Sequence, residues 1–503
     1  MTRNAARRLR RLRLGILIGT LACFVALFLL VRKPVLPLWA SRGVFFGLDP
    51  LIFLEHLATT RTILVYGLVS LIPLALTLVF GRFFCGWICP FGAIHEFISW
   101  VSRKRWSKHS GPDRPRLRFK YFVLTVVLVA AVAGTALAGW LDPFALLTRS
   151  AAAVIDPALA SVFSRLAGVP RLSVQPGMLG LIFLTVVALN TWKRRFFCNA
   201  LCPLGALYGL AARFSLMRFE TATDCQGCHL CSFRCSYDGN PGKDYLKSEC
   251  VVCMACVDDC PRGNVQVKFR WPKKALTPTL DLNRRQLLGS ATLGLAIAAL
   301  PKVALEAHPQ TQAGHGFLRP PGAIEERSFL AACVRCNQCV EACPTNFIQP
   351  AEQGAGLGMI WTPVLNAKAG YCQWECDRCM QACPTGALQL LTLQAKQAFK
   401  VGTAVIDRSR CFTYSDGFNC TVCVEKCPVP SKPLRFRLVE VQDFRGVRTR
   451  VQQVYVSPDL CTGCGICEHF CPRGGAPGIT ITCEDEDRQA VTIANAREWQ
   501  SNR

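Results

Sequence analysis

Four long apolar runs follow one another in the first 200 residues, and basic residues flank them. They cover residues 14–31, 63–80, 122–141 and 177–192. A helix of about 17–25 apolar residues is long enough to cross the hydrocarbon core of a bilayer, and the fourth run is near the short limit. The pattern predicts a membrane all-α bundle of four spans. A cleaved signal peptide is the alternative for the first run, although no small-residue cleavage site follows it.

Two of these runs end in nearly the same text, "GRFFCGWICPFGAI" at residues 81–94 and "RRFFCNALCPLGAL" at residues 194–207. A Leu-Asp-Pro triplet precedes each run, at residues 48–50 and 141–143. The chain therefore predicts a duplicated two-span unit, whose halves are related by a pseudo-twofold axis along the membrane normal. Asp49 and Asp142 are expected to cap short helices, because Asp before Pro is common where a helix begins.

The repeat contains two C-x3-C-P pairs, Cys85 with Cys89 and Cys198 with Cys202. Residues i and i+4 of a helical turn lie on one face, so both sulfurs of a pair point the same way. Three interpretations stay open. The four thiolates hold one further metal centre, the pairs act as redox dithiols, or the motif is a turn that orients the following helix.

Most of the 30 cysteines have a different spacing. Twenty-four form six quartets, four of them C-x2-C-x2-C-x3-C and two of them variants, and five of the six are followed by Pro. The quartets are Cys225, Cys228, Cys231 and Cys235; Cys250, Cys253, Cys256 and Cys260; Cys333, Cys336, Cys339 and Cys343; Cys372, Cys376, Cys379 and Cys383; Cys411, Cys420, Cys423 and Cys427; and Cys461, Cys464, Cys467 and Cys471.

This spacing is typical of bacterial ferredoxins and predicts six [4Fe–4S] clusters. Three close thiolates hold one cluster, and the fourth, before Pro, ligates the partner cluster. Zinc is the alternative, but zinc sites more often consist of two separated C-x2-C pairs. In the first module Cys260 is expected to complete the first three-cysteine loop and Cys235 the second. The last four quartets form two further α+β modules, whose pairing is either nested or sequential. Cys23 and Cys483 stay outside all sites.

The net charge of +25 is unevenly distributed. Residues 306–503 hold 20 Lys/Arg and 19 Asp/Glu, so 38 of the 58 basic residues and 14 of the 33 acidic residues lie in residues 1–305. The basic residues cluster beside the apolar runs, which favours a membrane over a nucleic-acid partner. By the positive-inside rule, the N-terminus and the first ferredoxin module are expected in the cytoplasm of a bacterium, at its inner membrane.

A second export signal is expected in mid-chain. The segment at 283–307 begins with Arg284-Arg285 and continues into small apolar residues, which resembles a twin-arginine signal. A short buried helix is the alternative. The predicted domains are 1–213 (membrane, with the two C-x3-C-P motifs), 214–275 (cytoplasmic two-cluster module), 276–307 (signal or fifth span) and 308–503 (periplasmic four-cluster domain).

These motifs together resemble a fusion of two ferredoxin-type proteins of periplasmic nitrate reduction, NapH and NapG. The NapG-like half also resembles MauM, and the membrane half is similar to NosR-type regulators. The resemblance implies a quinol dehydrogenase component that takes electrons from the quinone pool. The electrons would then pass to a periplasmic redox protein, a cytochrome or a molybdenum reductase such as nitrate reductase.

Two further functions stay open at this stage: a maturation factor that donates electrons to a periplasmic metalloenzyme, and an electron conduit between cytoplasm and periplasm. No catalytic residue is assigned. Glu55-His56 is a candidate to accept the protons of a quinol, with a polar turn as the simpler interpretation.

Overall fold

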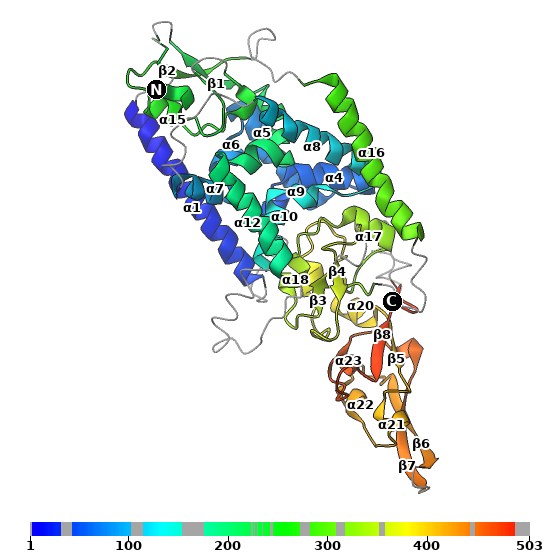
Figure 1. The fold of residues 1–503 in the computed structure, drawn as a ribbon. Helices are drawn as coiled ribbons and strands as arrows, with labels where there is room; N and C mark the ends of the chain where they lie inside the picture. Colours follow the sequence, from blue (N-terminus) through cyan, green and yellow to red (C-terminus); the bar gives the residue numbers. More distant parts are fainter. Residues whose placement is uncertain are drawn as a thin grey trace. The chain divides into compact units, whose positions relative to one another are not determined.

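The computed structural model describes residues 3–31, 43–101, 114–152, 176–222, 282–307, 317–351, 358–442 and 448–487 (Figure 1). It also describes residues 225–271 apart from 226, 229, 234 and 242–244. The chain divides into two compact units. Unit 1 comprises Met1–Leu30, Val35–Ala151 and Gly177–Ala299, and unit 2 comprises Val31–Pro34, Ala152–Pro176 and Leu300–Arg503. The predicted domain boundary at 275–276 lies outside the described residues.

Unit 1 is mostly helical, and its described residues contain one two-stranded sheet. Its helices are α1 (Arg3–Leu30), α3 (Val44–Gly47), α4 (Pro50–Thr60), η1 (Val65–Ser70), α5 (Leu71–Phe80), α6 (Phe83–Trp87), α7 (Pro90–Val101), α8 (Arg114–Val132), α9 (Ala138–Leu141), α10 (Pro143–Ser150), α12 (Pro176–Trp192), η4 (Phe197–Leu201), α13 (Pro203–Ala212), α14 (Leu230–Phe233), η5 (Lys247–Glu249), α15 (Ala255–Asp258) and the first part of α16 (Arg284–Ala307). Strands β1 (Met217–Thr221) and β2 (Val265–Phe269) pair antiparallel and enclose the first two cysteine quartets.

The predicted four-span bundle is wrong. Within the described residues, α1 is the one helix both long and apolar enough to cross a membrane, either as an anchor or as a signal sequence. The second run breaks into the 3-10 helix η1 and the ten-residue α5. The third run ends at Val132, and the helix of the fourth, α12, has 17 residues. A hydropathy window does not register a change of helix type such as that at η1. The described chain is a mixture of helices and strands with ferredoxin-type domains.

The two Asp-Pro caps predicted from the repeat are confirmed. Asp49 accepts hydrogen bonds from the backbone N–H groups of Leu51 and Ile52 at the start of α4. Asp142 does the same for Phe144 and Ala145 at the start of α10. Each carboxylate satisfies two N–H groups that a helix cannot pair internally.

Unit 2 is built from short helices and three two-stranded antiparallel sheets within its described residues. Its helices are α17 (Glu326–Ala332), α18 (Gln338–Ala342), α19 (Arg378–Gln381), α20 (Leu393–Ala398), α21 (Phe412–Ser415), α22 (Val422–Lys426), η7 (Pro458–Leu460) and α23 (Ile466–His469). The sheets pair β3 (Ile348–Pro350) with β4 (Pro363–Leu365), β5 (Thr403–Ile406) with β8 (Ile479–Thr482), and β6 (Leu434–Gln442) with β7 (Arg448–Val456). Strands β5 and β8 are far apart in sequence, and the fifth and sixth quartets lie between them along the chain. Their pairing therefore brings together the two ends of the segment that carries these quartets.

A buried charge network attaches the second cysteine quartet to the repeat. Glu249, directly before Cys250, accepts hydrogen bonds from Arg82 Nη1 at 3.0 Å and from the Tyr121 hydroxyl at 3.0 Å. Lys120 of α8 also pairs with this carboxylate, and the Arg82, Lys120 and Glu249 side chains are at most 1% exposed. Burial lowers the pKa of Lys120 to about 8, while the charge of Glu249 opposes that shift. Two cations therefore depend on one carboxylate.

We predict that Glu249→Ala destabilises the protein by about 3–5 kcal/mol, because it leaves Arg82 and Lys120 as buried charges without their counter-ion. Chemical unfolding followed by circular dichroism measures the loss. The matched control is Glu440→Ala, whose pair with Arg450 is exposed on both sides. The control is expected to cost about 0.5 kcal/mol or less. Equal losses in the two variants would contradict the role given to the network.

Candidate iron–sulfur cluster sites

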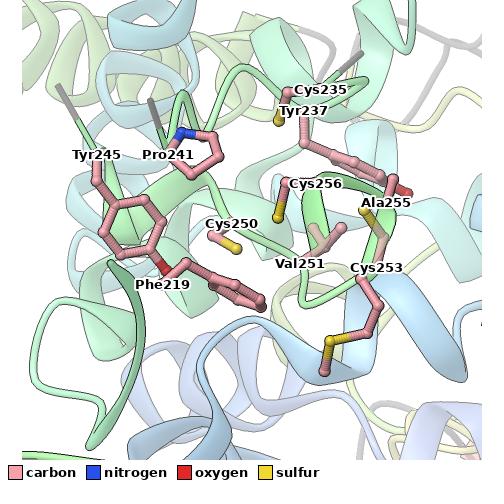
Figure 2. Close-up of a pocket in the computed structure, with 12 residues that line it drawn as sticks. Phe219, Cys235, Tyr237, Pro241, Tyr245, Cys250, Val251, Cys253, Ala255 and Cys256 are labelled. Carbon is pink, nitrogen blue, oxygen red and sulfur yellow. The ribbon is translucent and has the colours of Figure 1, made fainter. Parts of the chain in front are cut away.

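The first cluster site is a cavity of about 380 Å³ in unit 1, lined by the cysteines Cys250, Cys253, Cys256 and Cys235 (Figure 2). Three of them come from one quartet, and the fourth comes from the preceding quartet. They are the four cysteines that the ferredoxin pattern assigns to one cluster. Tyr237 and Tyr245 also line the cavity, and a hydrogen bond joins Tyr245 to Cys250.

The second site of this module is more open. Cys231 and Cys260 belong to one buried cluster with Val265 of β2. Cys225 acts electrostatically on Cys231, while Cys228 is exposed. Cys260 therefore lies with Cys231, and the full set of Cys225, Cys228, Cys231 and Cys260 stays a prediction.

In unit 2, the third and fourth quartets exchange their last cysteines. The charge of Cys383 raises the pKa of Cys336, after the larger effect of burial. In the opposite direction, the charge of Cys343 contributes to the raised pKa of Cys372 and of Cys376. The two four-cysteine sets are therefore Cys333, Cys336, Cys339 with Cys383, and Cys372, Cys376, Cys379 with Cys343.

The fifth and sixth quartets exchange in the same manner, around two cavities. One cavity of about 410 Å³ is lined by the cysteines Cys411, Cys420, Cys423 and Cys471. The other, of about 330 Å³, is lined by Cys461, Cys464, Cys467 and Cys427. The pairing of the last four quartets, which sequence spacing left open, is thus sequential in this structure and not nested.

The two modules of unit 2 meet at cysteines. The backbone N–H of Cys372 donates to the carbonyl of Cys464 at 2.8 Å, so ligand loops of two different modules are in direct contact. Beside this contact, the ring of Tyr371 lies 5.4 Å from those of His469 and Phe470. The fourth and sixth quartets are consequently neighbours in the fold.

Lys396 is a functional candidate that sequence reasoning missed. It is 5% exposed, and its Nζ donates to the carbonyls of Gln373 at 2.6 Å and Trp374 at 2.9 Å. Its charge lowers the pKa of Cys372, although burial raises that pKa to about 11 overall. A buried lysine between quartets has no spacing signature, so only the fold could reveal it.

The donor set fits iron–sulfur clusters. Three of the sites bring four thiols together around one cavity, and a [4Fe–4S] cluster bound there would supply one-electron transfer. Among the residues that the structure describes, no three His, Cys, Asp or Glu side chains gather closely enough to hold a metal ion. Burial of the thiols also means that loading a site releases protons.

The two C-x3-C-P pairs converge in unit 1. The pKa of Cys89 is raised well above its usual value, first by burial and then by the charges of Cys85 and Cys198. The pKa of Cys202 is raised likewise by burial and then by Cys198, Cys85 and Cys89. Each pair is therefore within electrostatic reach of the other, although the pairs lie more than 100 residues apart.

The equivalent arginines of the two repeats cross over between the halves. Arg195 Nη1, from the second repeat, donates to the carbonyl of Gly92 in the first repeat at 3.3 Å. A Cβ at the equivalent glycine, Gly205, would lie 3.0 Å from Arg82 Nη2 of the first repeat. Each arginine therefore lies against the equivalent glycine of the other repeat.

Glu55 and His56 do not form an open proton site. Glu55 Oε1 accepts hydrogen bonds from the backbone N–H groups of Leu137 and Ala138, where α9 begins. Burial lowers the pKa of His56 to about 4, so its imidazole is neutral at neutral pH. These contacts favour the simpler interpretation, a polar turn. Cys23 is exposed on α1, and Cys483 is half-buried.

Four family profiles match five segments of the chain. A profile described as "4Fe-4S binding domain" matches residues 62–109 and 174–221. A "4Fe-4S dicluster domain" matches residues 332–387, and two further "4Fe-4S binding domain" profiles match residues 454–475 and 247–263. No solved structure matches the chain.

Curated relatives cover about two fifths of the chain. The methylamine utilization ferredoxin-type protein MauM of Methylorubrum extorquens is 37% identical over 199 residues, which are 39% of this chain and 86% of the relative. The ferredoxin-type protein NapG of Escherichia coli is 36% identical over 37% of this chain and 80% of the relative. MauM of Paracoccus denitrificans is 34% identical over 40% of this chain and 88% of the relative.

The cysteine sites and the profiles together define a ferredoxin-type 4Fe–4S electron-transfer protein. The chain belongs to the family of ferredoxin-type proteins that contains MauM and NapG. These relatives do not show the expected fusion to NapH, and the expected similarity to NosR is unsupported.

We predict that the last cysteine of a quartet controls its partner's cluster. Cys383→Ser should abolish the same EPR signal as Cys336→Ser, because both side chains belong to one four-cysteine set. Cys376→Ser should abolish a different signal. EPR spectra of the three reduced variants, each compared with the wild type, test this pairing. If Cys383→Ser matched Cys376→Ser instead, the exchange of ligands would be refuted.

We also predict that Lys396→Gln lowers the reduction potential of the cluster at Cys372, Cys376 and Cys379. Removing a nearby cation makes an added electron less stable, while Gln can still donate to the two carbonyls. The expected shift is tens of millivolts, since about 1.4 kcal/mol corresponds to about 59 mV for one electron. An EPR-monitored redox titration measures it. The control is Lys400→Gln, whose charge Asp485 already offsets, and an equal shift there would contradict the prediction.

Proposed function

We propose that this protein takes electrons from a membrane quinol and relays them through six [4Fe–4S] clusters to a periplasmic redox protein, a cytochrome or a molybdenum reductase such as nitrate reductase. The observation that carries the proposal is the contact between Cys372 N and Cys464 O, which joins two two-cluster modules into one series. A protein that only stored a single electron would not need several adjoining cluster sites. The names of the relatives, a ferredoxin-type NapG and a MauM of methylamine utilization, support a redox protein as partner.

The proposed attachment to the membrane is through α1. Arg7 and Arg10, near the start of this helix, pair with Asp258 of the first ferredoxin module at 3.2 and 3.1 Å. Farther along, Ile18 is 61% and Leu29 is 46% exposed. The charged end of α1 is thus held against a cluster module. One side of its apolar remainder packs on the protein through Leu17 and Phe24, while the side of Ile18 and Leu29 is exposed. An inner-membrane anchor with the module on the cytoplasmic side fits this asymmetry.

The proposed export of residues 308–503 begins at Arg284-Arg285, at the start of α16. Iron–sulfur clusters are inserted in the cytoplasm, so a cluster domain that works in the periplasm has to cross the membrane folded. A twin-arginine signal serves folded cargo, which is the physical reason to expect one between the two sets of clusters.

In this proposal the chain contributes positioning and electrostatics. A quinol releases two electrons and two protons, and the electrons leave one at a time because each cluster accepts one. The buried cysteine loops exclude water from the sites, and Lys396 places a cation beside one of them. The protons go to water or to a base at the quinol site, which is not among the residues assigned here.

The test is reduction by a quinol in membranes that contain the full chain. We expect anaerobic addition of duroquinol to bleach the cluster absorption and to produce EPR signals, as dithionite does. Membranes without the chain are the control. Clusters that dithionite reduces and duroquinol does not would refute quinol oxidation. That result would favour the maturation factor, which donates electrons without respiratory turnover.

A further inference from the structure

We propose that Cys85, Cys89, Cys198 and Cys202 together ligate one additional iron–sulfur cluster, shared between the two halves of the repeat. The proposal does not depend on the quinol or on the partner. It concerns four cysteines that lie outside all six ferredoxin quartets.

The first argument is a count of ligands. Residues 62–109 and 174–221 each match a 4Fe–4S binding domain, yet each segment contains only two cysteines. A cluster ligated by cysteine alone takes four thiolates. Neither segment can therefore complete a cluster site by itself, whereas the two segments together supply four thiolates.

The second argument is convergence. Arg195 Nη1 of the second repeat donates to the carbonyl of Gly92 in the first at 3.3 Å, and a Cβ at Gly205 would lie 3.0 Å from Arg82 Nη2, so the two cysteine turns meet. Cys89 and Cys202 are at most 8% exposed. In each half of the repeat, a glycine three residues after the second cysteine lies close to the cysteine turn. A Cβ at Gly92 would lie 3.0 Å from the carbonyl of Cys85, and a Cβ at Gly205 would lie 3.5 Å from Cys202 Sγ. Equivalent glycines thus lie against both cysteine turns, and the approach is close at Gly92.

The third argument is charge. Arg82 and Arg195 are both 1% exposed, and the charges of both act on Cys198. Lys120 acts on it as well. A cluster with four thiolate ligands is a net anion, and burying an anion requires nearby cations. Glu249 and Glu96 pair with these cations on the other side, so the cations are fixed in place.

An unpartnered polar side chain adds an independent observation. Asn199, between the two cysteines of the second pair, is 0% exposed. Within the described part of the chain, neither its amide nitrogen nor its amide oxygen has a hydrogen-bond partner. Buried polar groups are nearly always paired, so an orphan beside four thiols indicates a group that belongs there.

The site adjoins the first ferredoxin module. Tyr237, which lines the cavity of Cys235, Cys250, Cys253 and Cys256, is within electrostatic reach of both Cys198 and Cys253. The guanidinium of Arg195 lies 4.2 Å from the centre of the Tyr237 ring. The shared cluster would therefore have a redox neighbour.

The experiment is an iron and acid-labile sulfide count on the purified full chain, with Mössbauer spectra. Six ferredoxin cubanes account for about 24 iron atoms. We expect an excess of about two atoms for a [2Fe–2S] cluster or about four for a cubane, and the spectra distinguish them. A wild-type count without excess would overturn the proposal.

Variants locate the excess iron. Cys89→Ser and Cys202→Ser should each lose all of it, and the double variant should lose no more, since the ligands serve one centre. Cys23→Ser, outside every site, is the control and should keep it. Half the loss in each single variant would mean two separate centres and contradict a shared one.

A second measurement protects the test against variants that fail to fold. In the wild type, alkylation followed by mass spectrometry should find these four thiols protected until a chelator removes the iron. Disulfides within the pairs, with no iron-dependent protection, would establish a redox dithiol and refute the cluster.

Discussion

A cubane cluster needs four thiolates, and one short turn of chain supplies only three of them. This constraint shapes all three ferredoxin modules. Each three-cysteine loop is completed by a cysteine from the partner quartet, as in the cavity of Cys411, Cys420, Cys423 and Cys471. Ligation therefore ties together segments that hydrophobic contacts between such short helices could not hold. Binding of the clusters and folding of the modules are consequently one process.

In unit 1 the same constraint is linked to a buried ion network. Glu249 fixes the turn before Cys250 by pairing with Arg82 and Lys120, which come from helical segments far earlier in the chain. The cost of burying three charges is offset only when all partners are present. The network thus makes the position of one cluster site depend on the integrity of the repeat.

In the repeat, the hydropathy pattern predicted more membrane-spanning helices than the structure contains among its described residues. Apolar runs predicted four spans, but the chain breaks the second run at η1 and buries Lys120 within the helix that leads into the third run. Hydropathy windows average over such features and do not register a break in helix geometry. The duplication itself was visible in the sequence. In the structure, Arg82 and Arg195 each lie against the equivalent glycine of the other repeat, so the two copies are in contact.

The sequence by itself determined the type of cofactor, the six quartets and the caps at Asp49 and Asp142, because ligand spacing and helix capping are local properties. Similarity to MauM and NapG identifies the family. Tertiary structure alone decided that the last four quartets pair sequentially, that Cys372 touches Cys464, and that Lys396 lies beside a cluster site. It also decided that the runs are not four spans. These features depend on contacts between segments that are far apart in the sequence. Neither periodicity nor the spacing of residues specifies which of these segments pack against each other.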